Sequence, residues 1–200
     1  PQIAALFANA PEWPPTRSQA IPQLREAVRA SSTAFPKFEV PLASIVDRSI
    51  PGPAGQIPLR VYTPPGAGPF PLISYFHGGG YVTGDLDTQD MIARALAFSA
   101  GAVVVSVDYR LAPEHRYPAA ADDCFNAYLG LLERGTPASR VVFMGESCGG
   151  SLALTVLLRL RDEGLPLPAC FVSLTGWFDL SVAGAPAPDG TRMTSKRFEG

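Results

Sequence analysis

Two glycine-flanked motifs contain the residues best suited to chemistry. The first runs from His77 to Gly80 (HGGG) and directly follows the apolar run from Leu72 to Phe76. The second runs from Gly145 to Gly149 (GESCG), between the apolar run 141–144 and a stretch with helical spacing. A serine in a Gly-x-Ser-x-Gly turn between a strand and a helix has its hydroxyl exposed, as a nucleophile requires. The two motifs together predict acyl transfer at Ser147.

Attack of a serine on an ester carbonyl creates an oxyanion, which needs hydrogen-bond donors. The backbone amide of Cys148, directly after the serine, is one expected donor, and Gly79 and Gly80 are expected to supply the others. Glycine suits such a loop because no Cβ keeps the backbone away from the substrate oxygen. His77 and Gly78 are predicted to support the loop. The competing interpretations are a flexible glycine turn and a serine that only caps a helix.

A serine hydroxyl is a weak nucleophile unless a base, normally a histidine, lies beside it. The chain has two histidines, His77 and His115, and neither follows the serine. His77 precedes the oxyanion glycines, and His115 lies in a proline-containing charged loop, so both are predicted to be structural. Asp179 follows the serine, but without a downstream histidine it is predicted to cap or to form an ion pair. The base is therefore expected outside these residues.

The cysteines offer an alternative nucleophile, because thiol pKa values fall at helix N-termini. Ser147 occupies the apex of the turn, however, so Cys148 is predicted to pack beneath it. Cys124 and Cys170 are predicted to be core residues. Three cysteines give neither an even disulfide set nor a zinc-ligand spacing, so a reducing, cytoplasmic location and no metal site are expected.

The composition is that of a globular protein, with 46% hydrophobic and 17% charged residues in a chain of 200. A net charge of −2 without a Lys/Arg run argues against nucleic acid as a partner. No apolar segment approaches the roughly 18 to 20 residues needed to span a membrane. The N-terminus also lacks the basic and then apolar pattern of a signal peptide.

The elements that must position the two motifs follow from hydrophobic periodicity and turn residues. Helices are predicted at 21–30, 88–99, 118–132 and 149–161. Strands are predicted at 40–46, 57–62, 72–76, 102–107, 141–144 and 170–174, with a turn from Pro51 to Gly55 between the first two. Alternating strands and helices with uninterrupted apolar strands predict a mostly parallel sheet covered by helices on both faces.

The chain resembles the hormone-sensitive-lipase branch of the α/β-hydrolases, which includes many bacterial carboxylesterases. The resemblance rests on the HGGG loop with residues 81–90 (YVTGDLDTQD), on 108–120 (DYRLAPEHRYPAA), on the serine elbow and on 177–180 (WFDL). It implies the α/β-hydrolase fold, hydrolysis of short-chain esters without a cofactor, and a cap built partly from N-terminal residues. The expected organisation is an N-terminal cap segment, 1–39, and a hydrolase core, 40–200.

Two departures from the family pattern stand out. The family elbow usually reads Gly-Asp-Ser-Ala-Gly-Gly, and here Glu146 and Cys148 replace the acid and the alanine. The family also places its catalytic Asp and His well after the serine, so both are expected beyond residue 200 and the chain is expected to be a fragment.

The leading functional hypothesis is a serine carboxylesterase whose acyl-enzyme forms at Ser147. A non-catalytic member of the same fold that binds a small ligand, and an inactive truncated fragment, stay open as alternatives. A homodimer is also left open.

Overall fold

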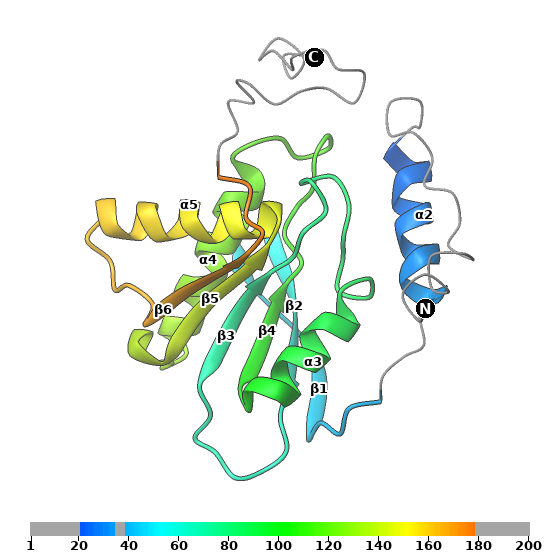
Figure 1. The fold of residues 1–200 in the computed structure, drawn as a ribbon. Helices are drawn as coiled ribbons and strands as arrows, with labels where there is room; N and C mark the ends of the chain where they lie inside the picture. The colour runs from blue at the N-terminus through cyan, green and yellow to red at the C-terminus, as the bar shows by residue number, and fades with distance from the viewer. Residues whose placement is uncertain (1–20, 35–38, 179–200) are drawn as a thin grey trace.

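The computed structural model describes residues 21–34 and 39–178, in which the strands form one six-stranded sheet ordered β1-β2-β4-β3-β5-β6 (Figure 1). The strands are β1 (Ser44–Gly52), β2 (Gly55–Thr63), β3 (Leu72–Phe76), β4 (Val103–Val107), β5 (Val141–Glu146) and β6 (Cys170–Leu174). The helices are α2 (Ile21–Ala34), α3 (Asp90–Ala100), α4 (Ala119–Glu133), η1 (Ala138–Arg140) and α5 (Cys148–Asp162). Strands β3 to β6 are parallel, and the β1–β2 hairpin joins them antiparallel through β2 and β4.

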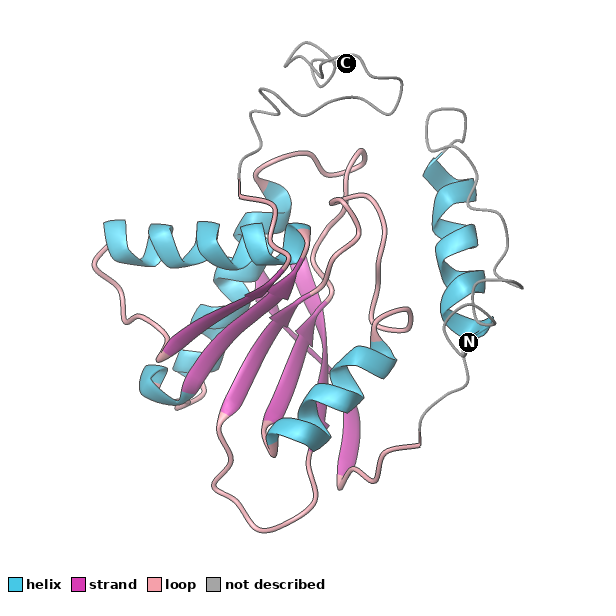
Figure 2. Cartoon of the chain, in the orientation of Figure 1, coloured by secondary structure: helices cyan, strands magenta, loops and turns pink. Residues whose placement is uncertain are grey.

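Helices cover both faces of this sheet, with α4 and α5 on one face and α3 on the other (Figure 2). Each face has its own apolar core. In β4, Val105 and Val107 pack in the core beneath α4 and α5, whereas Val104 packs with Ala93 and Ala97 of α3. Because successive side chains of a strand point to opposite faces, a strand buried on both faces reads as a continuous apolar run. The predicted mostly parallel sheet with helices on both faces is confirmed.

The β1–β2 hairpin differs from its prediction. The expected strands, 40–46 and 57–62, were separated by a turn from Pro51 to Gly55. In the structure the two strands pair from Ser44 opposite Thr63 to Gly52 opposite Gly55, so only residues 53 and 54 form the turn. Pro51 lies in β1, at the edge of the described sheet, which is where a strand tolerates proline.

Neighbouring carboxylates of α4 hold the loop after β4 and the helix α5. Asp123, only 2% exposed, accepts hydrogen bonds from the Arg110 guanidinium on both oxygens at 2.8 Å, and one from the Arg110 amide at 2.9 Å. Asp122 pairs with Arg159 of α5 at 2.9 Å. These contacts fix α4 to the two segments that flank the predicted site.

The prediction that Cys170 lies in the core is wrong. Cys170 begins β6, which is the edge strand of the described sheet, and its side chain is exposed. An apolar run predicts a strand but does not reveal the strand's place in the sheet. Cys124 in α4 is fully buried, as expected. Asp179 lies outside the described residues, among which no helix is long and apolar enough to cross a membrane.

Candidate active site

Ser147 lies on a sharp turn between β5 and α5. It follows Glu146, the last residue of the strand, and precedes Cys148, the first residue of the helix. Its backbone adopts φ 49° and ψ −123°, a conformation rare for a residue with a side chain. The residue is exposed, and its side chain makes no capping hydrogen bond to α5. The geometry is therefore that of a raised serine rather than an ordinary helix cap.

The glycines around the serine allow three backbone segments to meet. A Cβ on Gly145 would lie 2.2 Å from the carbonyl oxygen of Gly149, on the other side of the turn. A Cβ on Gly149 would lie 2.0 Å from the carbonyl oxygen of Phe76, at the end of β3. Both distances are far below ordinary van der Waals contact, so neither position admits a side chain. The structure thus brings the start of α5 directly against the start of the HGGG loop.

The HGGG loop closes on itself in a tight turn. The amides of Val82 and Thr83 donate to the Gly79 carbonyl at 3.1 and 3.0 Å. Gly79 has φ +125°, and a Cβ there would lie 2.2 Å from the Thr83 carbonyl oxygen. The Gly78 amide donates to a carboxylate oxygen of Glu146 at 3.3 Å. Glu146 thus links the serine elbow to the loop, a role that the sequence analysis missed.

Cys148 is buried beneath the turn, as predicted. Its Sγ accepts a hydrogen bond from the Tyr81 amide at 3.3 Å. Burial raises the pKa of the Cys148 thiol, and the Tyr81 and Gly80 amides partly offset this effect. A buried thiol that stays protonated is not a nucleophile.

His77 is fully buried at the base of the loop, and its Nδ1 lies 2.8 Å from the carbonyl oxygen of Gly78. The ring stacks on Tyr109 with 4.2 Å between centroids, and the Tyr109 hydroxyl donates to the His77 carbonyl at 2.6 Å. Burial lowers the pKa of His77 to about 4, so the ring is neutral at pH 7. These contacts brace the loop. The second histidine, His115, is exposed.

Asp108 is a carboxyl group near these loops whose pKa is raised. It directly follows β4 and is partly buried. Burial, together with the negative charges of Asp85 and Asp87, raises the pKa of its carboxyl to about 6. Ionisation of this carboxyl at pH 7 therefore lowers the free energy of unfolding.

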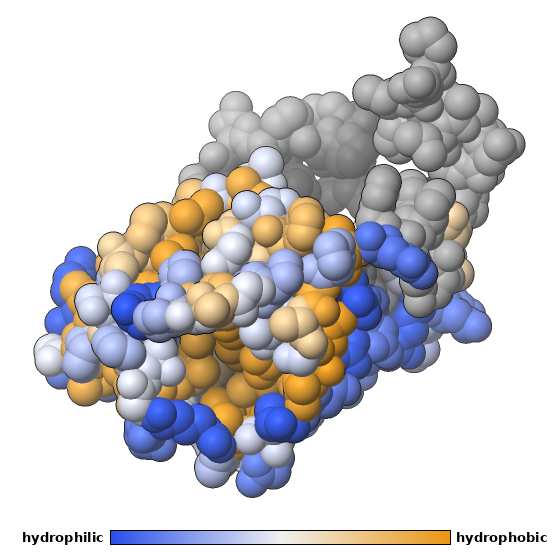
Figure 3. Space-filling model, turned by 90° about the horizontal axis from the view of Figure 1, so that it is seen from below, coloured by the Kyte–Doolittle hydropathy of each residue, from blue (hydrophilic) through white to orange (hydrophobic). Residues whose placement is uncertain are grey.

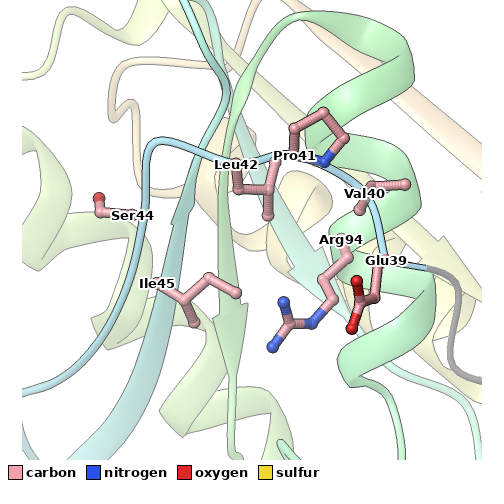
Figure 4. Close-up of a pocket in the computed structure, with 7 residues that line it drawn as sticks. All are labelled: Glu39, Val40, Pro41, Leu42, Ser44, Ile45 and Arg94. Atoms are coloured by element: carbon pink, nitrogen blue, oxygen red, sulfur yellow. The ribbon is translucent and has the colours of Figure 1, made fainter.

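A cavity lies at the opposite end of the sheet from Ser147. Its volume is about 610 Å³, and Figure 4 shows Arg94 of α3 reaching it beside residues 39–45. Ile45 pairs with Tyr62, which pairs with Val104 near the start of β4. Ser147 follows the carboxyl end of β5, so the cavity is not part of its surroundings. Seen from below, hydrophobic residues are visible between hydrophilic ones (Figure 3).

The arrangement around Ser147 is suited to stabilising negative charge. The serine sits at the N-terminus of the 15-residue helix α5, whose free amides and dipole favour an anion. The residues that the structure describes contain no group of His, Cys, Asp and Glu placed to hold a metal ion.

Proteins with sequences similar to this chain are named as esterases or ester hydrolases. "Esterase LipI" of Mycobacterium tuberculosis is 46% identical over 149 residues, covering 70% of this chain and 47% of the relative. "Carboxylic ester hydrolase LipN" of the same organism is 42% identical over 153 residues, covering 72% of this chain and 40% of the relative. The chain thus spans less than half the length of these two relatives.

Solved structures agree with these sequence matches. A hyperthermophilic esterase from the archaeon Pyrobaculum calidifontis superposes with a TM-score of 0.81 at 34% identity, covering 93% of this chain and 60% of that one. An esterase of the bacterial hormone-sensitive lipase family gives a TM-score of 0.78 at 29% identity, covering 98% of this chain and 64% of that one. A model of the family described as alpha/beta hydrolase fold matches residues 73–198. The chain therefore belongs to the α/β-hydrolase-fold family, in its hormone-sensitive-lipase branch.

Proposed function

We propose that the protein, in its full length, is a serine carboxylesterase that hydrolyses short-chain esters. Ser147 attacks the acyl carbonyl, and the amides of Gly79, Gly80 and Cys148 stabilise the oxyanion. Each such donor contributes about 3 kcal/mol to transition-state stabilisation. The observation that carries the proposal is the exposed Ser147 at φ 49°, on a turn packed against the HGGG loop. The names of the relatives support ester hydrolysis as the proposed class of reaction.

The base and acid of this reaction are proposed to lie beyond residue 200. His77 is an unsuitable base because it is buried beneath the loop and its Nδ1 is engaged with the Gly78 carbonyl. The proposed chemistry needs no cofactor, and the proposed location is the cytoplasm. The proposed division is a cap segment at 1–39 and a hydrolase core at 40–200. Sedimentation of the full-length protein would distinguish a homodimer from a monomer.

The test uses the full-length protein with a fluorophosphonate and a p-nitrophenyl ester of a short acid. The expected result is stoichiometric labelling at Ser147, located by mass spectrometry, together with turnover. The matched variant Ser147→Ala should lose both labelling and turnover while unfolding at the same temperature. A wild-type protein that neither labels nor hydrolyses any short-chain ester would contradict the proposal.

Two further outcomes identify the alternatives. Saturable binding of an ester without labelling or hydrolysis would identify a non-catalytic binding protein. The 200-residue chain alone is expected to show little or no turnover, because no histidine follows its serine. Rapid hydrolysis by a preparation whose mass corresponds to 200 residues would instead assign the base to His77 or His115.

A further inference from the structure

Arg25 connects the N-terminal helix α2 to the loops around Ser147. Its Nε donates to the carbonyl of Val82 at 2.7 Å, and its Nη2 donates to the carbonyl of Ala112 at 2.9 Å. The guanidinium also makes a bidentate pair with Glu114, at 2.9 and 2.7 Å. In Figure 1, α2 stands beside these loops rather than on a face of the sheet.

The two carbonyls that Arg25 binds belong to loops that also contact each other. Val82 lies in the turn that closes on Gly79, because its own amide donates to the Gly79 carbonyl at 3.1 Å. Ala112 lies in the loop after β4, and its amide donates to the Tyr81 carbonyl at 2.9 Å. A planar guanidinium with several fixed donors can span both carbonyls at once, which a lysine ammonium cannot do with comparable geometry.

The ion pair alone does not explain this arrangement. Glu114 is exposed, and an exposed ion pair adds little to stability because water and salt screen it. Hydrogen bonds to two backbone carbonyls, by contrast, fix where the chain runs. Arg29 of the same helix provides a comparison, since its guanidinium pairs with the Asp85 carboxylate at 2.9 Å.

We propose that Arg25 is a positioning residue for the oxyanion loop, holding the turn at Gly79 to Thr83 against the loop at Ala112. The helix α2 thereby contributes to the placement of the oxyanion donors without touching the substrate. The expected effect on kcat rests on the proposed esterase function. The expected effect on the position of the turn rests on the contacts alone.

The kinetic test compares the full-length wild type with Arg25→Ala, Arg25→Lys and Arg29→Ala. Donors aimed at the oxyanion act in the transition state, so their displacement lowers kcat more than it changes KM. A displacement of about 1 Å can cost about a hundredfold in rate. For a smaller displacement of the donors, we expect Arg25→Ala to lower kcat about tenfold while KM stays within about twofold of wild type. Arg25→Lys should restore little of the lost kcat, because an ammonium group cannot bind both carbonyls with the same geometry. Millimolar guanidinium should partly restore Arg25→Ala, and Arg29→Ala should stay within about twofold of wild type.

A second measurement does not depend on activity. Hydrogen exchange of the amides at 79–83 and at 112 should be at least about tenfold faster in Arg25→Ala than in wild type, because the turn loses its clamp. In Arg29→Ala the same amides should exchange at the wild-type rate.

The outcomes separate the two proposals. An inactive wild type whose exchange follows the expected pattern contradicts the esterase function and leaves the clamp standing. An active wild type with unchanged kcat and exchange in Arg25→Ala overturns the clamp. Equal losses in Arg25→Ala and Arg29→Ala also overturn it, since they assign the effect to attachment of α2 in general.

Discussion

Replacing Gly149 by alanine should displace the start of α5 from the end of β3. The new Cβ would lie 2.0 Å from the Phe76 carbonyl oxygen and 2.6 Å from that of His77, both of them backbone atoms. Contacts below 3.0 Å are essentially never observed for a Cβ, so the two segments must separate by about 1 Å. Overpacking costs about 1–3 kcal/mol, and the upper end applies here because neither neighbour is a mobile side chain.

We therefore expect Gly149→Ala to lower the free energy of unfolding by about 3 kcal/mol. In a domain of this size that loss corresponds to a fall in Tm of about 6–12 °C. The measurement is guanidinium unfolding followed by far-UV circular dichroism. The shift also moves the Cys148 amide relative to the HGGG loop, so the folded variant of an active full-length protein should lose about a hundredfold in kcat.

The matched control is Gly130→Ala, near the C-terminal end of α4. There the new Cβ would meet the terminal Cδ1 of Ile50 at 3.0 Å, and a side-chain end can move away. Alanine also favours the helix by about 1 kcal/mol, so this variant should be at least as stable as wild type. If Gly149→Ala unfolds within about 0.5 kcal/mol of wild type, the close approach of helix and strand described above is refuted.

Three further predictions concern charge and thiol chemistry. Asp108→Asn should stabilise the protein at pH 7, because the pKa of Asp108 rises from 3.8 to about 6 on folding and its ionisation therefore opposes folding. The full pKa shift corresponds to about 3 kcal/mol, and the partial exposure of the carboxyl reduces the expected gain in the free energy of unfolding to about 1 kcal/mol. In urea titrations this gain should vanish as the pH falls from 6 to below 4. Arg110→Ala should cost about 3–5 kcal/mol in the same titrations by leaving the buried Asp123 carboxylate unpaired, and a loss below 1 kcal/mol would contradict this. Ellman's reagent should leave Cys124 and Cys148 unreacted in the native protein and react with both in denaturant, whereas their immediate reaction in the native protein would contradict their burial.

The strands and helices of the core could be predicted because their signals are local. Strands β3 and β6 have the bounds that their apolar runs indicate, since a continuous apolar stretch between turn residues is typical of a buried parallel strand. The hairpin was mispredicted because Pro51 and Gly52 favour a turn locally, whereas pairing with β2 keeps them extended. The exposure of Cys170 likewise depends on the order of strands in the sheet, which no local pattern specifies.

The candidate site was predictable to the extent that it consists of contiguous motifs. Ser147 and the HGGG loop meet because each follows a neighbouring parallel strand of the sheet. The supporting contacts come from residues far apart in the sequence. In the sequence, Arg25 is a charged residue of a predicted helix, and its neighbours give no sign that it binds the carbonyls of Val82 and Ala112. Glu146 was noted only as a departure from the family motif.

The contacts of the Ser147 backbone have a consequence for the order of events during synthesis. Its amide donates to the Leu174 carbonyl at 3.0 Å, and its carbonyl accepts from the Trp177 amide at 3.2 Å. Both partners leave the ribosome after the whole of α5 has been made. The serine turn therefore lacks these two backbone hydrogen bonds until β6 has paired with β5. A nascent chain that ends at Asp162 carries the complete GESCG motif but not yet the geometry that motif adopts in the finished fold.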